Sequence, residues 1–357
     1  MSEIEKIIRM ADTYCRQNDP EKMNWSWGEA LVMYSLSELD SLINEERYFK
    51  YYKRYADSHY KKGITVDQSD TCAPALITHR LYQKTGELPY REMTDAAVAY
   101  LKNEPRLIGD LINHNGHSRD SRDYPKSIWI DSLMMSGVFG SIAARDYGDE
   151  ELMKFAMKQP DQFSRYLQDE ETRLYHHSWW KRLNRAYPRK LFWGRGNGWA
   201  VASFAFMYRF TLSETCAEHL KDVSAALLEY QRDDFYFDTV FNKPGDNYRE
   251  SSATALIAAG WLAGIREGIL GQEYLEPAVK AFKAVVENFE YSGKDVYMTE
   301  TSLWTIPMFF MPYRLRIGPY PGYKYVKKGR NVPYGVASLI LAAVEYESLK
   351  KEQPDVE

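Results

Sequence analysis

The sequence lacks the features that mark several classes of protein. It has only three cysteines, Cys15, Cys72 and Cys216, which are far apart and odd in number. This spacing favours neither a disulfide framework nor a Cys-x-x-Cys zinc site. No run of about 18 apolar residues is present, so no membrane-spanning helix is expected. The first residues, MSEIEKIIRM, carry charges where a secretory signal needs an apolar stretch, which predicts a cytoplasmic protein.

Positive charge is not in excess either. The chain has 46 Lys and Arg against 50 Asp and Glu, a formal net charge of −4. Proteins that bind nucleic acid need surplus cations to neutralise phosphates, so neither nucleic acid nor a membrane is expected as a partner. Aromatic residues, in contrast, are abundant: they make up 15% of the chain, with 28 Tyr and 9 Trp. Such rings fill a core or line a cleft in which the C–H faces of sugars stack.

Apolar residues recur at helical spacing along most of the chain, and no convincing β-rich run interrupts them. The pattern predicts an all-α protein with about twelve helices. They are expected over residues 2–17, 27–43, 46–61, 73–84, 91–103, 131–146, 150–166, 197–213, 215–231, 251–267, 273–288 and 333–350.

The helices are expected to pair as hairpins. Gly86, Gly148 and Gly271 each lie between two of them, where a glycine just past a helix end stops it. Their spacing indicates a repeat of about 60 residues, typical of a helix-hairpin unit. We therefore predict a single (α/α)6 barrel, one catalytic domain over residues 1–357, with an open solenoid as the alternative. Most residues of chemical interest fall in three longer connections, 104–130, 167–196 and 289–332.

The most specific string runs from Trp193 to Trp199 and reads WGRGNGW. No strand precedes it and the third glycine of a dinucleotide fingerprint is missing, which excludes a Rossmann site. Its glycines would let the backbone approach a ligand closely. Asn197 would cap the helix that follows.

Two carboxylates stand where helices are expected to begin. Asp131 follows Trp129 directly before one helix, and Asp70 precedes another. Because Asp is a favoured N-cap, the residues alone allow a purely structural role for both. His177, in the His176-His177 pair of a loop, is open to the same interpretation.

Taken in order, these strings resemble glycoside hydrolase family 105, the unsaturated rhamnogalacturonyl hydrolases, and more distantly the unsaturated glucuronyl hydrolases of family 88. The resemblance also includes Trp25-Ser26-Trp27, Leu81–Gly86, Glu250-Ser251-Ser252 and Pro333–Val336. It implies a glycosidase that removes a terminal 4,5-unsaturated uronic acid from short, pectin-type oligosaccharides generated by lyases. The expected partner is this small oligosaccharide substrate, and the sequence does not predict an oligomeric state.

The resemblance also assigns roles. Asp131 matches the general acid and base, and Asp70 the second carboxylate, which would hold sugar hydroxyls. Burial under Trp129 and Trp193, with repulsion from Asp70, would raise the pKa of Asp131. Arg195 would hold the substrate carboxylate through two parallel hydrogen bonds, or form a structural salt bridge. The residues expected to bind substrate are Trp27, Trp129, Met135, His177, Trp193, Arg195 and Trp199.

No metal or cofactor is expected. His114 and His117 have a spacing that metal ligands can have, but Asn115-Gly116 between them is typical of a turn, and no companion ligand stands nearby. The chain departs from the family pattern at Trp180, where relatives often carry Asp. A second departure is the unusually basic stretch before Asp131. Both bear on which sugar follows the unsaturated uronate.

Other functions stay open at this point. A conventional inverting glycosidase could use Asp70 and Asp131 as acid and base on the same barrel. A sugar epimerase would need two facing histidine bases. A non-catalytic, carbohydrate-binding helical-repeat protein has the same periodicity, because a fold alone does not define an activity.

Overall fold

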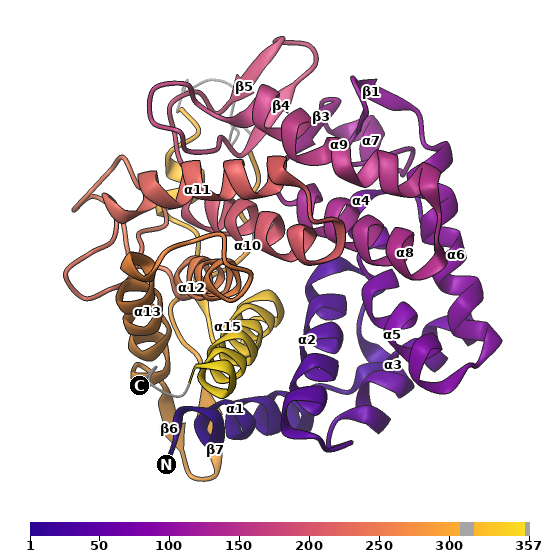
Figure 1. The fold of residues 1–357 in the computed structure, drawn as a ribbon, viewed down its shortest axis with the longest axis horizontal. Helices are drawn as coiled ribbons and strands as arrows, with labels where there is room; N and C mark the ends of the chain where they lie inside the picture. Colours follow the sequence, from indigo (N-terminus) through magenta and orange to yellow (C-terminus); the bar gives the residue numbers. More distant parts are fainter. Residues whose placement is uncertain (308–317, 354–357) are drawn as a thin grey trace.

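The computed structural model describes residues 1–307 and 318–353. Helices dominate it (Figure 1). The long helices are α1 (Glu3–Gln17), α2 (Trp27–Ile43), α3 (Phe49–Lys62), α5 (Ala75–Thr85), α6 (Leu88–Asn103), α8 (Phe139–Tyr147), α9 (Glu150–Leu167), α10 (Gly194–Thr211), α11 (Glu214–Leu228), α12 (Ser251–Arg266), α13 (Leu275–Glu287) and α15 (Pro333–Glu352). The short ones are η1 (Pro20–Lys22), α4 (Ser69–Cys72), α7 (Asp120–Asp123), η2 (Leu133–Val138), η3 (Gln272–Tyr274) and α14 (Pro321–Lys324).

Alternate long helices close into a ring. Each of these helices contacts the next in the order α2, α5, α8, α10, α12 and α15, and α15 contacts α2 again. The inner helices are buried on nearly every side, as α12 is from Ser251 to Ile265. The outer helices α1, α3, α6, α9, α11 and α13 bury only one stripe, as expected of a surface layer. The predicted (α/α)6 barrel is therefore confirmed, and the open solenoid is wrong.

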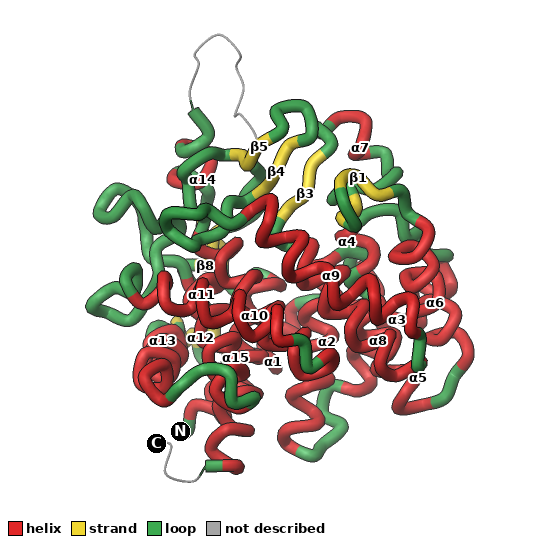
Figure 2. Tube along the Cα trace, turned by 45° about the horizontal axis from the view of Figure 1, so that its top comes forward, coloured by secondary structure: helices red, strands yellow, loops and turns green. Residues whose placement is uncertain are grey.

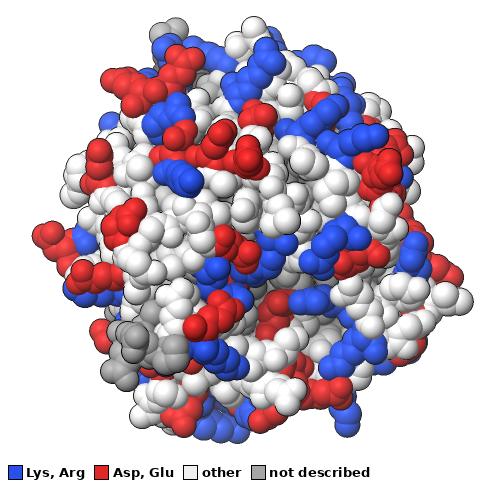
Figure 3. Space-filling view, viewed as in Figure 1, with Lys and Arg blue, Asp and Glu red and all other residues white. Residues whose placement is uncertain are grey.

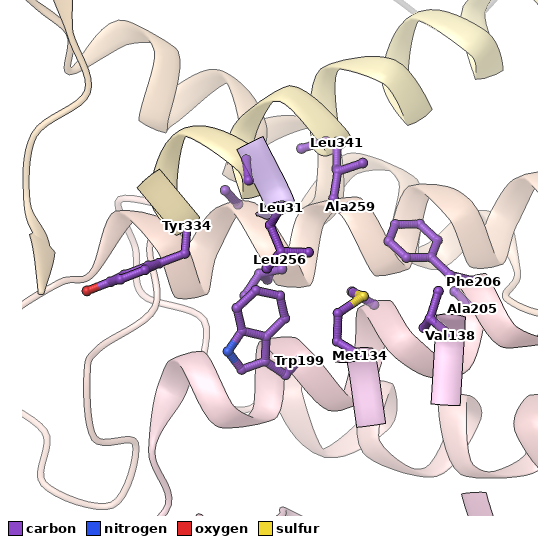
Figure 4. Packing of buried hydrophobic residues seen from close by; sticks show 14 of the residues in the cluster. Leu31, Met134, Val138, Trp199, Ala205, Phe206, Leu256, Ala259, Tyr334 and Leu341 are labelled. Carbon is purple, nitrogen blue, oxygen red and sulfur yellow. The ribbon is translucent and has the colours of Figure 1, made fainter. Parts of the chain in front are cut away.

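Apolar side chains fill the centre of this ring. Figure 4 shows Leu31 of α2, Met134 of η2, Phe206 of α10, Leu256 of α12 and Leu341 of α15 converging there. Because these helices come from widely separated parts of the chain, the core depends on closure of the whole ring. No helix of the described ranges is long and apolar enough to span a membrane.

The strands are short and lie in the connections. They are β1 (Arg106–Ile108), β2 (Leu111–Ile112), β3 (Ser127–Trp129), β4 (Ser178–Trp180), β5 (Arg185–Tyr187), β6 (Glu290–Ser292), β7 (Asp295–Tyr297), β8 (Thr301–Ser302) and β9 (Lys328–Gly329). The largest sheet has the order β3-β4-β5, all antiparallel. Figure 2 shows β3–β5 with long loops and α7 at one end of the barrel. The expectation of no substantial sheet holds for the described residues.

Helix boundaries differ from the predictions where turn chemistry was misread. Gly86 and Gly148 do end helices, with φ of 70° and 62°. Gly271 does not, because α12 already ends at Arg266 and Gly268 takes the positive φ of 70°. The predicted helix 73–84 is preceded by the separate turn α4. Residues 308–317, within the connection 289–332, lie outside the described ranges.

Candidate active site

A cavity of about 300 Å³ opens among the connections that carry β3 and the start of α10. Of the residues predicted to form the site, all but His177 and Trp199 line it. Those in the wall are Trp27, Asp70, Trp129, Asp131, Met135, Trp193 and Arg195. The volume is at the lower end of the range for small-molecule sites.

Asp131 lies in the turn between β3 and the π-helix η2. It does not cap the helix, because the N-cap position belongs to Ser132. The Oδ1 atom of Asp131 is buried and has no hydrogen-bond partner in the described part of the chain. Its Oδ2 atom lies 3.7 Å from Nε2 of His177. A buried carboxylate oxygen without a partner is rare in a folded protein, which makes a structural role a poor explanation.

Asp70 lies within the short helix α4 and is not its N-cap either, since Gln68 takes that position. Its Oδ1 atom lies 3.7 Å from Nε2 of His114. Burial, and next the negative charge of Asp131, raise the pKa of Asp70 to about 7. Sequence analysis did not predict a raised pKa for Asp70.

His114 supports both Trp129 and Asp70. Its ring stacks on Trp129 at 4.1 Å, with 6° between the planes. Its Nδ1 atom shares a 2.8 Å hydrogen bond with Oγ of Ser132, and burial lowers the pKa of the ring to about 4. His117 instead contacts Glu104 at 2.6 Å. The two histidines thus have different partners, and the described residues contain no group of three metal-ligating side chains.

His177 is fully buried behind the cavity wall. It stacks on Trp193 at 4.0 Å, and its Nδ1 atom shares a 2.7 Å hydrogen bond with the Tyr323 hydroxyl. Burial lowers the pKa of His177, which favours the neutral ring. It is not part of the cavity wall itself, but it contacts Asp131 and Trp193, which are.

The string from Trp193 to Trp199 differs in detail from the prediction. Helix α10 begins at Gly194, so Asn197 is inside it and is not its cap. Asn197 binds the connection before it: Oδ1 accepts from the Tyr175 N–H and Nδ2 donates to the Tyr175 carbonyl. A Cβ on Gly194 would lie 2.3 Å from the Asp238 carbonyl oxygen. This glycine is thus needed for close packing of the chain on itself.

Arg195 lies between two aromatic rings, 4.8 Å from the centre of Trp193 and 4.5 Å from that of Tyr334. Its Nη1 atom donates to Oγ of Ser302 at 2.7 Å and lies 3.6 Å from the buried carboxylate of Glu250. The structural salt bridge that sequence analysis left open is present. The Nε atom of Arg195 is buried and has no hydrogen-bond partner among the described residues.

Two further predicted residues differ in exposure. Trp27 lines the cavity and stacks on Tyr334 at 4.7 Å. Trp199 lies behind it, edge-on at 6.1 Å, and is 1% exposed. Trp199 therefore supports Trp27 from the core. Met135 packs near Trp27 and lines the cavity, as predicted.

Several residues at the site escaped sequence analysis. Glu250 appeared only as part of a family string, and nothing linked it to Arg195. Tyr323 is 146 positions from His177, too far for any local pattern to join them. The cavity wall also includes Ser26, Gln68, Asn115, Asp120, Tyr124, Trp304, Thr305 and Ile306.

The sequence model of Glycosyl Hydrolase Family 88 matches residues 3–350. The chain belongs to this family. As a family 88 member it is a glycosidase, which confirms the enzyme class predicted from the ordered strings. The chain is also 24% identical over 298 residues to the unsaturated rhamnogalacturonyl hydrolase YesR of Bacillus subtilis (strain 168), covering 81% of this chain and 83% of YesR.

Solved structures agree on the fold of this family 88 member. A family 105 glycoside hydrolase from C. acetobutylicum ATCC 824 matches with a TM-score of 0.85 and 21% identity, covering 96% of this chain and 99% of that one. The unsaturated glucuronyl hydrolase of Bacillus sp. GL1 matches with a TM-score of 0.75 and 16% identity, covering 99% and 97%. The predicted resemblance to families 105 and 88 is thus confirmed.

Proposed function

We propose that this glycosidase removes a terminal 4,5-unsaturated uronic acid from short oligosaccharides made by polysaccharide lyases. The names of the relative YesR and of the structurally similar glucuronyl hydrolase support this substrate class. Contact between α15 and α2, which closes the helix ring, supports one catalytic domain over residues 1–357. Cytoplasmic location stays a prediction.

The observation that carries the proposal is the Oδ1 atom of Asp131, buried in the cavity wall without a partner among the described residues. We assign Asp131 as the acid that protonates C4 of the C4=C5 double bond. Water then adds to C5, and the Asp131 carboxylate takes a proton from that water. The resulting hemiketal opens and releases the rest of the chain as an alcohol, with the acid restored.

Asp70 takes the second role. With its pKa raised to about 7, it is largely protonated in mildly acidic solution and can donate a hydrogen bond to a sugar oxygen. Its 3.7 Å contact with His114, itself stacked on Trp129, fixes it beside the cavity. Trp27, Trp129 and Trp193 offer faces for the sugar ring.

Arg195 supplies positive charge for the uronate carboxylate. Its Nη2 atom makes only longer contacts, 3.3 Å to the Leu303 carbonyl oxygen and 3.4 Å to Thr305 Oγ1. This nitrogen is the one that a substrate carboxylate can approach while Nη1 keeps Glu250 and Ser302.

The decisive assay follows the ultraviolet absorbance of the conjugated uronate on a panel of lyase-generated disaccharides. Loss of that absorbance with release of the second sugar supports hydration. Equal turnover of matched saturated uronides would instead make the enzyme a conventional inverting glycosidase. Binding without turnover of any member would contradict the proposed substrate class.

A further inference from the structure

Two segments beside the cavity carry clustered positive charge. Residues 119–126 and 181–189 hold seven cations and two carboxylates, a net charge of +5 within these segments in a chain whose total is −4. Arg185 and Arg189 also line a second cavity, together with Asp169, Glu170 and Glu171. We call the seven cations the basic rim. They are Arg119, Arg122, Lys126, Lys181, Arg182, Arg185 and Arg189.

Every side chain of the basic rim is exposed, and none forms an ion pair with another described residue. The contrast with their neighbour is clear, since Lys190 contacts both Asp169 and Glu171 at 2.9 Å. Figure 3 shows Lys and Arg, interspersed with Asp and Glu, along the upper edge of the molecule, where Figure 1 places β3–β5. Like charges held together repel one another, and a bound anion would relieve that repulsion.

The strands connect the basic rim to the site. Lys126 precedes β3, which ends at Trp129 in the cavity wall. At a rise of about 3.3 Å per residue, Lys126 lies roughly 10 Å along the strand from Trp129. Lys181 follows β4 and donates its N–H to the Lys126 carbonyl at 3.0 Å. Asp120 and Tyr124, which belong to the segment 119–126, line the cavity itself.

We propose that the basic rim binds an anionic group on the part of the oligosaccharide that leaves. The preferred substrates would then carry a carboxylate or a sulfate ester on the sugars that follow the unsaturated uronate. Substrates in which those sugars are neutral would not be preferred. This inference rests on the proposed function, because it names the substrate that the same site receives. Cations beside the cavity would also speed the encounter with an anionic chain.

The test variant is Lys181→Glu/Arg182→Glu/Arg185→Glu. These residues lie in or beside the exposed β4–β5 turn, and their side chains have no ion-pair partner in the described structure, so the fold should tolerate reversal. Two lyase products are compared, with the same unsaturated uronate and either a neutral or an anionic second sugar. We expect kcat/KM on the anionic product to fall about tenfold or more, and on the neutral product less than about twofold.

The matched control is Lys50→Glu/Lys61→Glu/Lys221→Glu. It makes the same change in net charge at exposed positions on α3 and α11 that also lack ion pairs. We expect it to resemble the wild type on both products. The wild-type preference for the anionic product should also shrink as salt is raised past about 0.1 M, where the screening length is about 10 Å.

Equal losses on both products, or no loss on either, would overturn the proposal. Uronate and sulfate products run in parallel show which anion is preferred. Retardation of the protein in gels that contain polygalacturonate or a sulfated polysaccharide measures anion binding by the basic rim and does not require turnover. If neither product is hydrated, the proposed function fails, but the gels still test anion binding by the basic rim. That binding is supported only if the wild type and the control variant are retarded and the charge-reversed variant is not.

Discussion

The Nε2 atom of His177 lies 3.7 Å from the Oδ2 atom of Asp131, while the opposite ring nitrogen is held by the Tyr323 hydroxyl. The imidazole is fixed further by stacking on Trp193. Among the described residues, Oδ2 of Asp131 contacts His177, and Oδ1 has no hydrogen-bond partner.

We predict that His177→Phe lowers kcat by roughly tenfold, the effect of losing about 1.4 kcal/mol of interaction with a charged group. Phenylalanine keeps an aromatic ring against Trp193 and removes both nitrogens. KM should change little, because His177 does not line the cavity. Steady-state kinetics alongside thermal melting checks this, and an unchanged kcat in a folded variant would show that His177 only fills space.

The second prediction concerns Asp70 and stability. Its pKa rises from 3.8 to about 7 on folding, so the folded state prefers the protonated form. Below about pH 4 both states are protonated and no penalty exists; between about pH 4 and 7 the penalty for ionisation grows as pH rises. Asp70→Asn removes this penalty.

The difference in melting temperature between Asp70→Asn and the wild type should therefore increase, in favour of the variant, from about pH 4 to 7. Above that window the difference should stay constant. Asp123→Asn, which removes an exposed carboxylate, is the control. A constant difference between Asp70→Asn and the wild type across the window would show that burial does not perturb this group.

The third prediction concerns Arg195. Arg195→Lys keeps the charge but loses the planar fork that reaches Ser302, Glu250 and the cavity together. We expect a raised KM and a lower melting temperature, because Glu250 is fully buried and needs its partner. Breaking a buried pair costs about 3–5 kcal/mol, so Arg195→Met should be the more destabilised variant. Wild-type values for both quantities in Arg195→Lys would contradict this account.

The fourth prediction concerns metals. Acid and base hydration by Asp131 needs no ion, so activity should survive exhaustive EDTA treatment. The residual rate after dialysis is the measurement. A loss of rate that zinc or calcium restores would contradict the prediction.

The barrel could be predicted because its signal is local. Helices such as α12, apolar from Ser251 to Ile265 except for small polar residues, show their burial in the sequence itself. Glycines in positive φ at Gly86 and Gly148 stop helices by the same local logic. Gly271 was misread because Gly268, three residues earlier, already satisfied the helix end.

The site could be predicted only in part. Asp70 and Asp131 are next to helix starts, and a barrel brings such ends together at one face. What depends on packing across the barrel could not be predicted. The contact of Arg195 with Ser302 spans 107 positions, and that of His177 with Tyr323 spans 146. Trp199 is in the same string as Arg195, but it lies one turn further along α10, where it is buried behind Trp27.

The fifth prediction carries the central claim, that Asp131 moves the proton. Asp131→Asn is nearly isosteric, and Asp131 does not cap its helix, so the melting temperature should stay close to that of the wild type. Asp70→Asn, measured beside it, should lose less activity because Asp70 contributes a hydrogen bond.

The most direct test is the rate of Asp131→Asn at saturating unsaturated disaccharide. We predict a loss of about 10²–10⁴-fold in a fully folded protein, as expected when a general acid and base is removed. A folded Asp131→Asn that keeps more than about a tenth of the wild-type rate, well above what that loss allows, would contradict the account. So would a larger loss in Asp70→Asn, which would reverse the two roles.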